Sequence, residues 1–249
     1  MTNFLRALSF LTILPVGQIR LSEEKELARS MAFFPFVGLV IGLLLTTGYY
    51  LFSLILPKPI TLWLILGLLA LLTRGLHLDG FADTLDGLAS GGSKEKILEV
   101  MRDSRIGAFG VFSLILLIGG KYLALDQVPS PSLPYSLILM TVMGRNSMVL
   151  VCFRSSYAGP GEGLAKPFIE NLGYREIALS LATAFGIALL AMGVKGILVF
   201  LGIGLFSLGY RYFFIKKLGG VTGDVLGGAN ELSELLCLIL LVILEPIHL

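Results

Sequence analysis

The sequence predicts an all-α integral membrane protein, a polytopic transmembrane helix bundle with about seven spans. Of its 249 residues, 55% are hydrophobic and only 14% are charged, whereas a soluble domain carries about 25% charged residues. Apolar runs close to the ~20 residues that a bilayer requires recur along the chain. We expect residues 1–249 to form a single integral-membrane catalytic domain, with the lipid bilayer around it.

The first element, over residues 1–15, is expected to be an amphipathic helix that lies against the membrane or the helix bundle. It lacks the small-residue cleavage site of a secretory signal peptide. Only Gly193 to Lys195 separates the fifth candidate span from the sixth. Gly38 and Gly42 give the first span a GxxxG pair, which suits close helix packing. The candidate spans are residues 31–56, 60–73, 107–125, 134–153, 176–192, 194–214 and 232–247.

The basic residues are distributed unequally between the two sides of the membrane. Of the 19 Lys and Arg residues, all except Lys58, Lys121, Lys195 and Arg145 fall on the side that holds the N-terminus. The three lysines are assigned to short links on the opposite side. Because cytoplasmic segments carry an excess of Lys and Arg, the N-terminus is predicted to be cytoplasmic. The chemistry is therefore expected at the cytoplasmic face.

Aspartates gather between the second and third spans. Asp79, Asp83 and Asp86 are spaced i, i+4 and i+7, which places their carboxylates on one face of a helix. Like charges so close repel one another unless a cation lies between them. Together with Asp103, they offer carboxylate oxygens without a Cys or His cage, which suits Mg²⁺ bound also by waters and substrate phosphates. We predict that these four aspartates are metal ligands or catalytic groups.

Two further residues in this stretch carry weaker signals. Gly80 permits a close backbone approach, which would help to admit a large ligand. His77 would donate a hydrogen bond to a substrate phosphate or carry a proton near neutral pH. A histidine that simply lies at the membrane interface has the same sequence pattern, so both interpretations of His77 stay open.

Two arginines are candidate phosphate contacts. Arg105 stands just before a span, where its planar guanidinium would bind a phosphate through two parallel N–H donors. A helix that begins near Gly107 would add N–H donors and a positive dipole end for an anion. Arg145 lies inside the fourth span, where a charge is costly and should face the bundle interior. There it would pair with an acidic residue or reach a substrate phosphate.

A second acidic group precedes the last span. Asp224, Glu231 and Glu234 are spaced i, i+7 and i+10, again one helical face, and Asn230 lies beside them. Asp224 falls in a Gly-rich turn, while the two glutamates open the last apolar run. We expect this group to complete the substrate site. For the glutamates alone, ordinary capping of a helix N-terminus is the competing interpretation.

Clustered carboxylates, arginines and glycine turns at one face of a bundle favour phosphoryl-group transfer. One partner would be a nucleotide-activated substrate whose diphosphate Mg²⁺ bridges, and the other an alcohol whose proton an acid accepts. No nucleic-acid partner is expected, because the chain has no basic run. The residues alone go no further than this reaction class.

The chain resembles the cobalamin synthase family over essentially its whole length. The matching strings occur in the family's order: Phe10-Leu-Thr-Ile-Leu-Pro15, Phe33-Phe-Pro-Phe-Val-Gly38, Gly75-Leu-His-Leu-Asp-Gly-Phe-Ala-Asp-Thr-Leu-Asp-Gly87, Met101-Arg-Asp-Ser-Arg-Ile-Gly-Ala-Phe-Gly110, and Thr222-Gly-Asp224 with Glu231 and Glu234. The third and fourth of these strings are long and specific. Residues 145–170 match more loosely, and members of the family often carry an acid where this chain has Leu78.

The resemblance implies an adenosylcobinamide-GDP ribazoletransferase of the prokaryotic inner membrane, acting in the last steps of cobalamin biosynthesis. Adenosylcobinamide-GDP would react with α-ribazole or α-ribazole 5'-phosphate, with Mg²⁺ as cofactor and GMP as the second product. The four aspartates would be metal ligands or base, Arg105 and Arg145 would bind phosphate, and the second acidic group would complete the site. Oligomeric state stays open.

Two other functions remain as alternatives. A CDP-alcohol phosphotransferase also joins an alcohol to a nucleotide-activated phosphate, but its signature requires an Arg that does not follow Asp79-Gly80 here. A cation or metabolite transporter would need acids near the bilayer midplane and a route to the other face. The acids in this sequence instead cluster at one predicted face.

Overall fold

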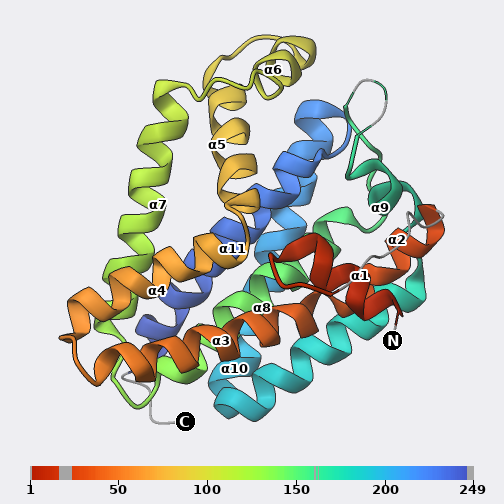
Figure 1. Cartoon of the computed structure of the whole chain (residues 1–249). Coiled ribbons are helices and arrows are strands. Elements are labelled where there is room, and N and C mark those ends of the chain that lie inside the picture. Colours follow the sequence, from red (N-terminus) through yellow and green to blue (C-terminus); the bar gives the residue numbers. More distant parts are fainter. Residues whose placement is uncertain (1, 17–23, 160, 162, 246–249) are drawn as a thin grey trace.

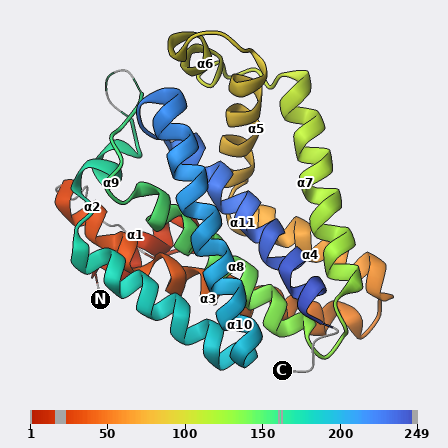
Figure 2. The ribbon, with the colours of Figure 1, turned by 180° about the vertical axis from the view of Figure 1, so that it is seen from behind.

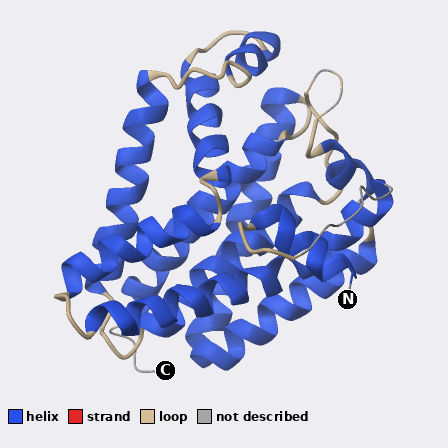
Figure 3. Ribbon diagram, viewed as in Figure 1, coloured by secondary structure: helices blue, strands red, loops and turns tan. Residues whose placement is uncertain are grey.

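The structure is a computed structural model that describes residues 2–16, 24–159, 161 and 163–245. Within these residues every regular element is a helix and no strand forms (Figure 3), so the predicted all-α fold is confirmed. The elements are α1 (Thr2–Leu11), α2 (Glu24–Ser30), the short 3₁₀ helix η1 (Met31–Phe33), α3 (Phe34–Ser53), α4 (Lys58–Leu72), α5 (Leu76–Ala89), α6 (Lys94–Val100), α7 (Ala108–Gln127), α8 (Leu133–Cys152), α9 (Lys166–Asn171), α10 (Tyr174–Leu218) and α11 (Gly223–Leu244).

Helix α8 runs through the centre of the bundle, with α3, α10 and α11 packed around it (Figure 1). The contact with α3 depends on Gly38 and Gly42. A Cβ atom on Gly38 would lie 2.5 Å from the carbonyl oxygen of Thr141. The Thr141 hydroxyl donates to the carbonyl oxygen of Gly38 at 2.8 Å. The GxxxG pair therefore packs as the sequence predicts.

Helix α1 lies against the bundle, as the amphipathic pattern predicts. Its Ala7, Leu8 and Leu11 side chains are buried. Phe10 packs on Phe168 of α9, with ring centroids 4.8 Å apart. The N-terminal helix is thus part of the folded core and forms one wall of the cavity described below.

Helices α4 and α5 meet at an angle of 89°. Arg74 (φ 56°) and Gly75 (φ 65°) both adopt the left-handed conformation in the turn between them. This sharp turn stops α4 and directs α5 across α11 and beside α7 (Figure 1). The helix that carries the three spaced aspartates is therefore held between two other helices rather than in a solvated loop.

Helix α10 is a hairpin of two arms. Its backbone leaves helical geometry at Met192 and Gly193. The rings of Phe185 and Phe200 lie 5.6 Å apart, whereas fifteen residues of straight helix would separate them by about 22 Å. The bend coincides with the break predicted between residues 192 and 194, and both arms are visible in Figure 2.

Five helical segments in the described residues are long and apolar enough to cross a membrane: Glu24–Ser53, α7, α8, α10 and α11, with the bent pair of α4 and α5 as a sixth. This establishes a multi-pass membrane protein. The count of seven spans stays a prediction, because α10 counts as one segment when helices are judged by length and apolar composition alone. The last predicted span, 232–247, extends at its end beyond the described residues.

The short links of the bundle meet at one end. Lys58 Nζ donates to the carbonyl oxygens of Asp126 (2.5 Å) and Val128 (3.1 Å), which joins the α3–α4 and α7–α8 links. The α10 bend lies toward the same end in both views (Figures 1 and 2). Lys121, which we assigned to a link at this end, is buried inside the bundle instead. That assignment was wrong, because α7 runs on for a further turn and a half before it ends at Gln127.

Candidate active site

The candidate site forms where α5 crosses α11. A Cβ atom on Gly80 would lie 2.8 Å from the Cα atom of Asp224, so the glycine permits the crossing. Gly227 on α11 meets the backbone of His77 in the same way. The close approach predicted for Gly80 is thus to another helix of the protein. It brings the first acidic group against Asp224 of the second.

Four carboxylates gather around this crossing, those of Asp79, Asp83, Asp86 and Asp224. Asp79, Asp224 and Asp86 are the charges that act on Asp83, and all three are acidic. Asp79 and Asp83 form no hydrogen bond or ion pair with another described residue. Asp224 accepts a hydrogen bond from the Thr222 hydroxyl at 3.3 Å. Since no described cation pairs with Asp79 or Asp83, their oxygens are available to a ligand.

Asp86 has a different environment from its two neighbours on α5. Its carboxylate accepts hydrogen bonds from the backbone N–H groups of Gly107 and Gly110, both at 2.7 Å. A Cβ atom on either glycine would collide with the carboxylate. The anion predicted at the N-terminus of this helix is therefore the protein's own Asp86, which caps α7.

Asp103 and Arg105 pair with each other in the exposed link before α7. Arg105 Nη2 donates to Asp103 Oδ2 at 2.7 Å, and the Arg105 backbone N–H donates to Oδ1 at 3.0 Å. The guanidinium and then the backbone N–H lower the pKa of Asp103 to about 2. The structure thus separates Asp103 from the crossing, and its metal role stays a prediction, as does phosphate binding by Arg105.

His77 is buried on α5 rather than at the membrane interface. The residue contributes to the wall of a cavity of about 150 Å³ together with Asp79 and Asp224, and the charges that act on its ring are those of Arg145, Glu234 and Lys121. Neither ring nitrogen has a hydrogen-bond partner within the described part of the chain. A buried imidazole without a partner is unusual, and the catalytic role expected for His77 stays a prediction.

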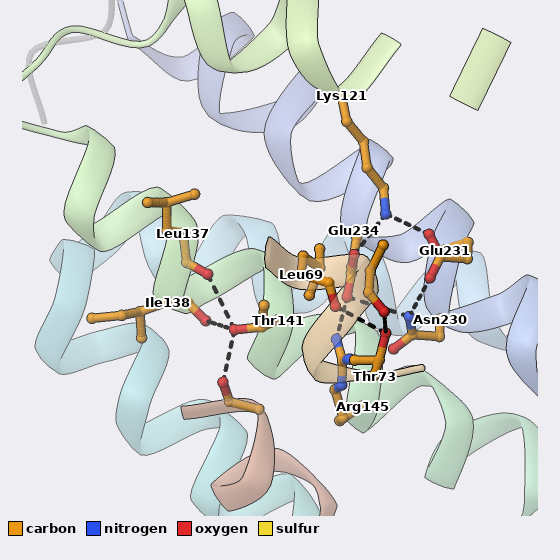
Figure 4. Close-up of polar contacts among 12 residues, drawn as sticks. Leu69, Thr73, Lys121, Leu137, Ile138, Thr141, Arg145, Asn230, Glu231 and Glu234 are labelled. Carbon is orange, nitrogen blue, oxygen red and sulfur yellow. Dashed lines mark hydrogen bonds and ion pairs between the residues drawn. The ribbon is translucent and has the colours of Figure 1, made fainter. Parts of the chain in front are cut away.

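The two glutamates of the second acidic group, Glu231 and Glu234, form a charge network deep in the bundle (Figure 4). Lys121 Nζ contacts Glu231 Oε2 at 2.5 Å and Glu234 Oε2 at 2.6 Å. Arg145 donates to Glu234 Oε1, which confirms the predicted pairing of Arg145 with an acid. Asn230 Nδ2 donates to both glutamates, at 3.1 Å and 3.3 Å.

Glu231 and Glu234 do not open the last span, as we expected from the sequence. The span begins at Gly223, because the Gly-rich segment that suggested a turn is helical and packs closely on α5. Both glutamates are buried beside Lys121 and Arg145. Their substrate role, with that of Asn230, stays a prediction. Sequence reasoning missed Lys121, although a lysine inside an apolar run signals a partner in the bundle interior.

A cavity of about 850 Å³ opens beside the crossing. Asp79 lies at its wall and also lines the 150 Å³ cavity, so the two spaces meet at this carboxylate. Two arginines that sequence reasoning did not select, Arg6 and Arg74, line the large cavity. The other walls are mostly apolar, from α1, α5, α7 and Leu164. This composition suits a large ligand that has both an apolar body and an anionic group.

The donor set fits a magnesium ion only in part. Among the described residues, no three Asp, Glu, His or Cys side chains converge as a metal cage. Asp86 and Asp103 are engaged by the contacts above, and metal binding by these two aspartates stays a prediction. Asp79 and Asp83 remain available, and Mg²⁺ in phosphoryl-transfer sites takes one or two carboxylates with waters and substrate phosphates.

Comparison with known proteins gives a consistent family. A family model described as cobalamin-5-phosphate synthase matches residues 3–242. The relative from Geotalea daltonii is 41% identical over 95% of each chain, that from Acetivibrio thermocellus 38% over 96% of each chain, and that from Clostridium tetani 34% over 99% of this chain and 98% of its own. All three are named adenosylcobinamide-GDP ribazoletransferase. No solved structure matches the chain.

Proposed function

We propose the reaction below from the premise that this chain belongs to the cobalamin-5-phosphate synthase family. It transfers the adenosylcobinamide phosphate moiety from adenosylcobinamide-GDP to α-ribazole or α-ribazole 5'-phosphate. The products are adenosylcobalamin or its 5'-phosphate and GMP, in the final steps of cobalamin biosynthesis. The relatives that carry this name match along nearly their full length, which is the observation that supports the reaction most directly.

Asp79, with waters and the substrate phosphates, would hold Mg²⁺ at the α5–α11 crossing. When bound there, the ion would neutralise charge on the diphosphate of adenosylcobinamide-GDP. Asp79 lines the large cavity, and Asp83, one turn further along α5, likewise has no hydrogen-bond or ion-pair partner among the described residues. The cavity, mostly apolar with Asp79 at its wall, would take the activated corrinoid.

We assign Asp83 as the acceptor for the proton of the ribazole hydroxyl. Its electrostatic neighbours Asp79, Asp224 and Asp86 are all acidic. Transfer of the hydroxyl proton to Asp83 removes one charge from this repelling group, which lowers the energy of the step. Asp224 would lie opposite as a second contact to the reacting groups.

We place the site at the cytoplasmic face of a prokaryotic inner membrane. The short links at the opposite end carry few basic residues, whereas the segments next to the crossing carry many. With Lys121 found inside the bundle, the asymmetry is greater than the sequence alone suggested. Both substrates are water-soluble cytoplasmic metabolites in this proposal, so the site would fill from that side.

The experiment is a direct assay of the purified protein in detergent. It is incubated with adenosylcobinamide-GDP, α-ribazole 5'-phosphate and Mg²⁺, and GMP and the corrinoid product are separated by chromatography. We expect both products in equal amounts, and neither after EDTA treatment, with recovery on adding Mg²⁺. Absence of product from folded protein with intact substrates would refute the reaction. Full activity in EDTA would refute the magnesium role alone.

A further inference from the structure

The turn between α4 and α5 holds an arginine in a conformation that suits glycine better. Arg74 has φ 56°, and among the described non-glycine residues only Arg154 shares a positive φ. Its successor Gly75 has φ 65°. Residues other than glycine are disfavoured there, and such conformations cluster at functional sites. A glycine at position 74 would fit the backbone better, so the side chain itself is the feature to explain.

The Arg74 side chain is anchored at one point and otherwise open. Its Nη2 atom donates to the carbonyl oxygen of Thr12, 3.2 Å away, at the end of α1. No acid among the described residues pairs with it. Arginine carries further N–H donors in a rigid fork. One contact therefore ties the guanidinium to the end of α1, while its remaining donors and its positive charge have no partner among the described residues.

Arg6, the other arginine of the large cavity, differs in this respect. It forms an ion pair with Glu26 at 2.6 Å and a hydrogen bond with Asn3 at 2.6 Å. Its charge is thus balanced within the protein. Arg74 is the cation in the wall of this cavity that faces no acid, which makes it the stronger anion site of the two.

Arg74 and Asp79 line the same cavity without pairing with each other. One turn of α5 separates Gly75 from Asp79, whose backbone N–H donates to the Gly75 carbonyl oxygen at 2.9 Å. A fixed cation and an open carboxylate at one wall suit a diphosphate: the guanidinium binds oxygens directly, and the carboxylate binds through a divalent cation.

We propose that Arg74 binds the diphosphate of the nucleotide-activated substrate in the large cavity. The inference rests on the proposed function and deepens it, because it assigns the substrate's anionic group to a residue with no role so far. The energetically unfavourable turn serves to aim the guanidinium into the cavity beside Asp79.

The test measures binding and turnover of Arg74 variants in detergent. Arg74→Gly removes the guanidinium and relaxes the backbone, so its unfolding temperature should not fall. Loss of a charge-assisted contact should weaken equilibrium binding of adenosylcobinamide-GDP on the order of 10- to 100-fold. The KM for α-ribazole 5'-phosphate should stay at the wild-type value. Arg74→Lys should recover part of the loss, because it keeps the charge without the fork.

Arg154→Gly is the matched control. It makes the same substitution at the other left-handed position, where the guanidinium packs over Tyr174 at 5.2 Å from its ring centroid. We expect wild-type affinity for adenosylcobinamide-GDP from this variant. Free guanidine added to Arg74→Gly should restore part of its affinity, which a purely structural role of Arg74 would not produce.

Four outcomes would overturn the inference. Unchanged affinity in Arg74→Gly would show that the guanidinium does not contact the substrate, and wild-type product formation in the same preparation would leave the proposed function intact. Equal losses in Arg74→Gly and Arg154→Gly would indicate a general structural effect. Unchanged affinity with less copurified phospholipid would assign Arg74 to a lipid phosphate. A wild-type protein that neither binds nor converts the substrate would refute the proposed function as well.

Discussion

At the scale of single residues, three aspartates that share one face of α5, Asp79, Asp83 and Asp86, have different environments. Asp83 faces other acids and has no partner among the described residues. Asp86, one turn further along α5, accepts two backbone N–H groups of α7. Helical spacing predicts which side chains share a face, but it does not predict which neighbouring element meets them.

Replacing Asp86 by Ala should therefore destabilise the fold. Two half-buried backbone N–H groups at the start of α7 would lose their acceptor, at a cost of about 1–3 kcal/mol. Thermal unfolding in detergent measures the change. The control is Asp103→Ala, which removes a carboxylate from an exposed pair with Arg105 and should leave the unfolding temperature nearly unchanged. Equal stability of the Asp86→Ala variant and wild type would show that this cap contributes nothing.

The residue types of the candidate site were largely accessible from the sequence. Asp79, Asp83 and Asp224 were selected, and the structure brings them together. Arg74 was not selected from the sequence, because a single arginine at the end of an apolar run is typical of an ordinary residue at the membrane boundary. Only its backbone conformation and the cavity beside it distinguish this arginine from the others.

At the scale of helices, the charge network ties α7, α8 and α11 together. Lys121 comes from α7, Arg145 from α8, and both glutamates from α11. Two cations face two anions, so each charge is compensated inside the bundle. The network brings charged groups into the bundle interior, as a transporter would require, but here the carboxylates are bound by protein cations rather than open to a passing ion.

Removing one member should cost more than removing a balanced pair. Lys121→Met leaves Glu231 buried beside only Asn230, which should destabilise the protein by about 3–5 kcal/mol. The double variant Lys121→Met with Glu231→Gln removes both charges and should recover most of that stability. Thermal unfolding of both variants in one detergent makes the comparison. A double variant as unstable as the single one would contradict the compensation argument.

The sequence predicted the type of each element better than its limits. The break at Gly193 was visible as a short polar interruption and proved to be a bend. The start of α11 was placed too late, because glycines that usually signal a turn serve here to let α5, α11 and Tyr210 pack closely. Glycine has both uses, and only the packing partner decides between them.

At the scale of the whole molecule, the distribution of basic residues and the arrangement of the links agree. The links at residues 54–57 and 128–132 lie at one end, opposite the crossing of α5 and α11 (Figure 1). The all-α membrane bundle was predictable from composition alone. Few charges and long apolar runs indicate membrane spans, and a helix satisfies all of its backbone hydrogen bonds within the span. The bend of α4 into α5 was not predictable, because residues 76–89 show no membrane-span pattern of their own.

Cysteine labelling should show which end faces the cytoplasm. Ser130 in the α7–α8 link and Ser104 in the α6–α7 link are both exposed, so they form a matched pair. In right-side-out membrane vesicles, an impermeant maleimide should label Ser130→Cys, and should label Ser104→Cys only after permeabilisation. The unmodified chain is the control, because Cys152 and Cys237 are buried. The reverse pattern would place the active site outside.

The Asp83→Asn variant tests the proposed role of Asp83 in the chemistry at the α5–α11 crossing. The substitution keeps the shape of the side chain while it removes one charge from a repelling group. We predict that GMP release falls by about 100-fold or more, while the unfolding temperature stays at or above that of wild type. A variant that is folded and releases GMP at the wild-type rate would contradict the account.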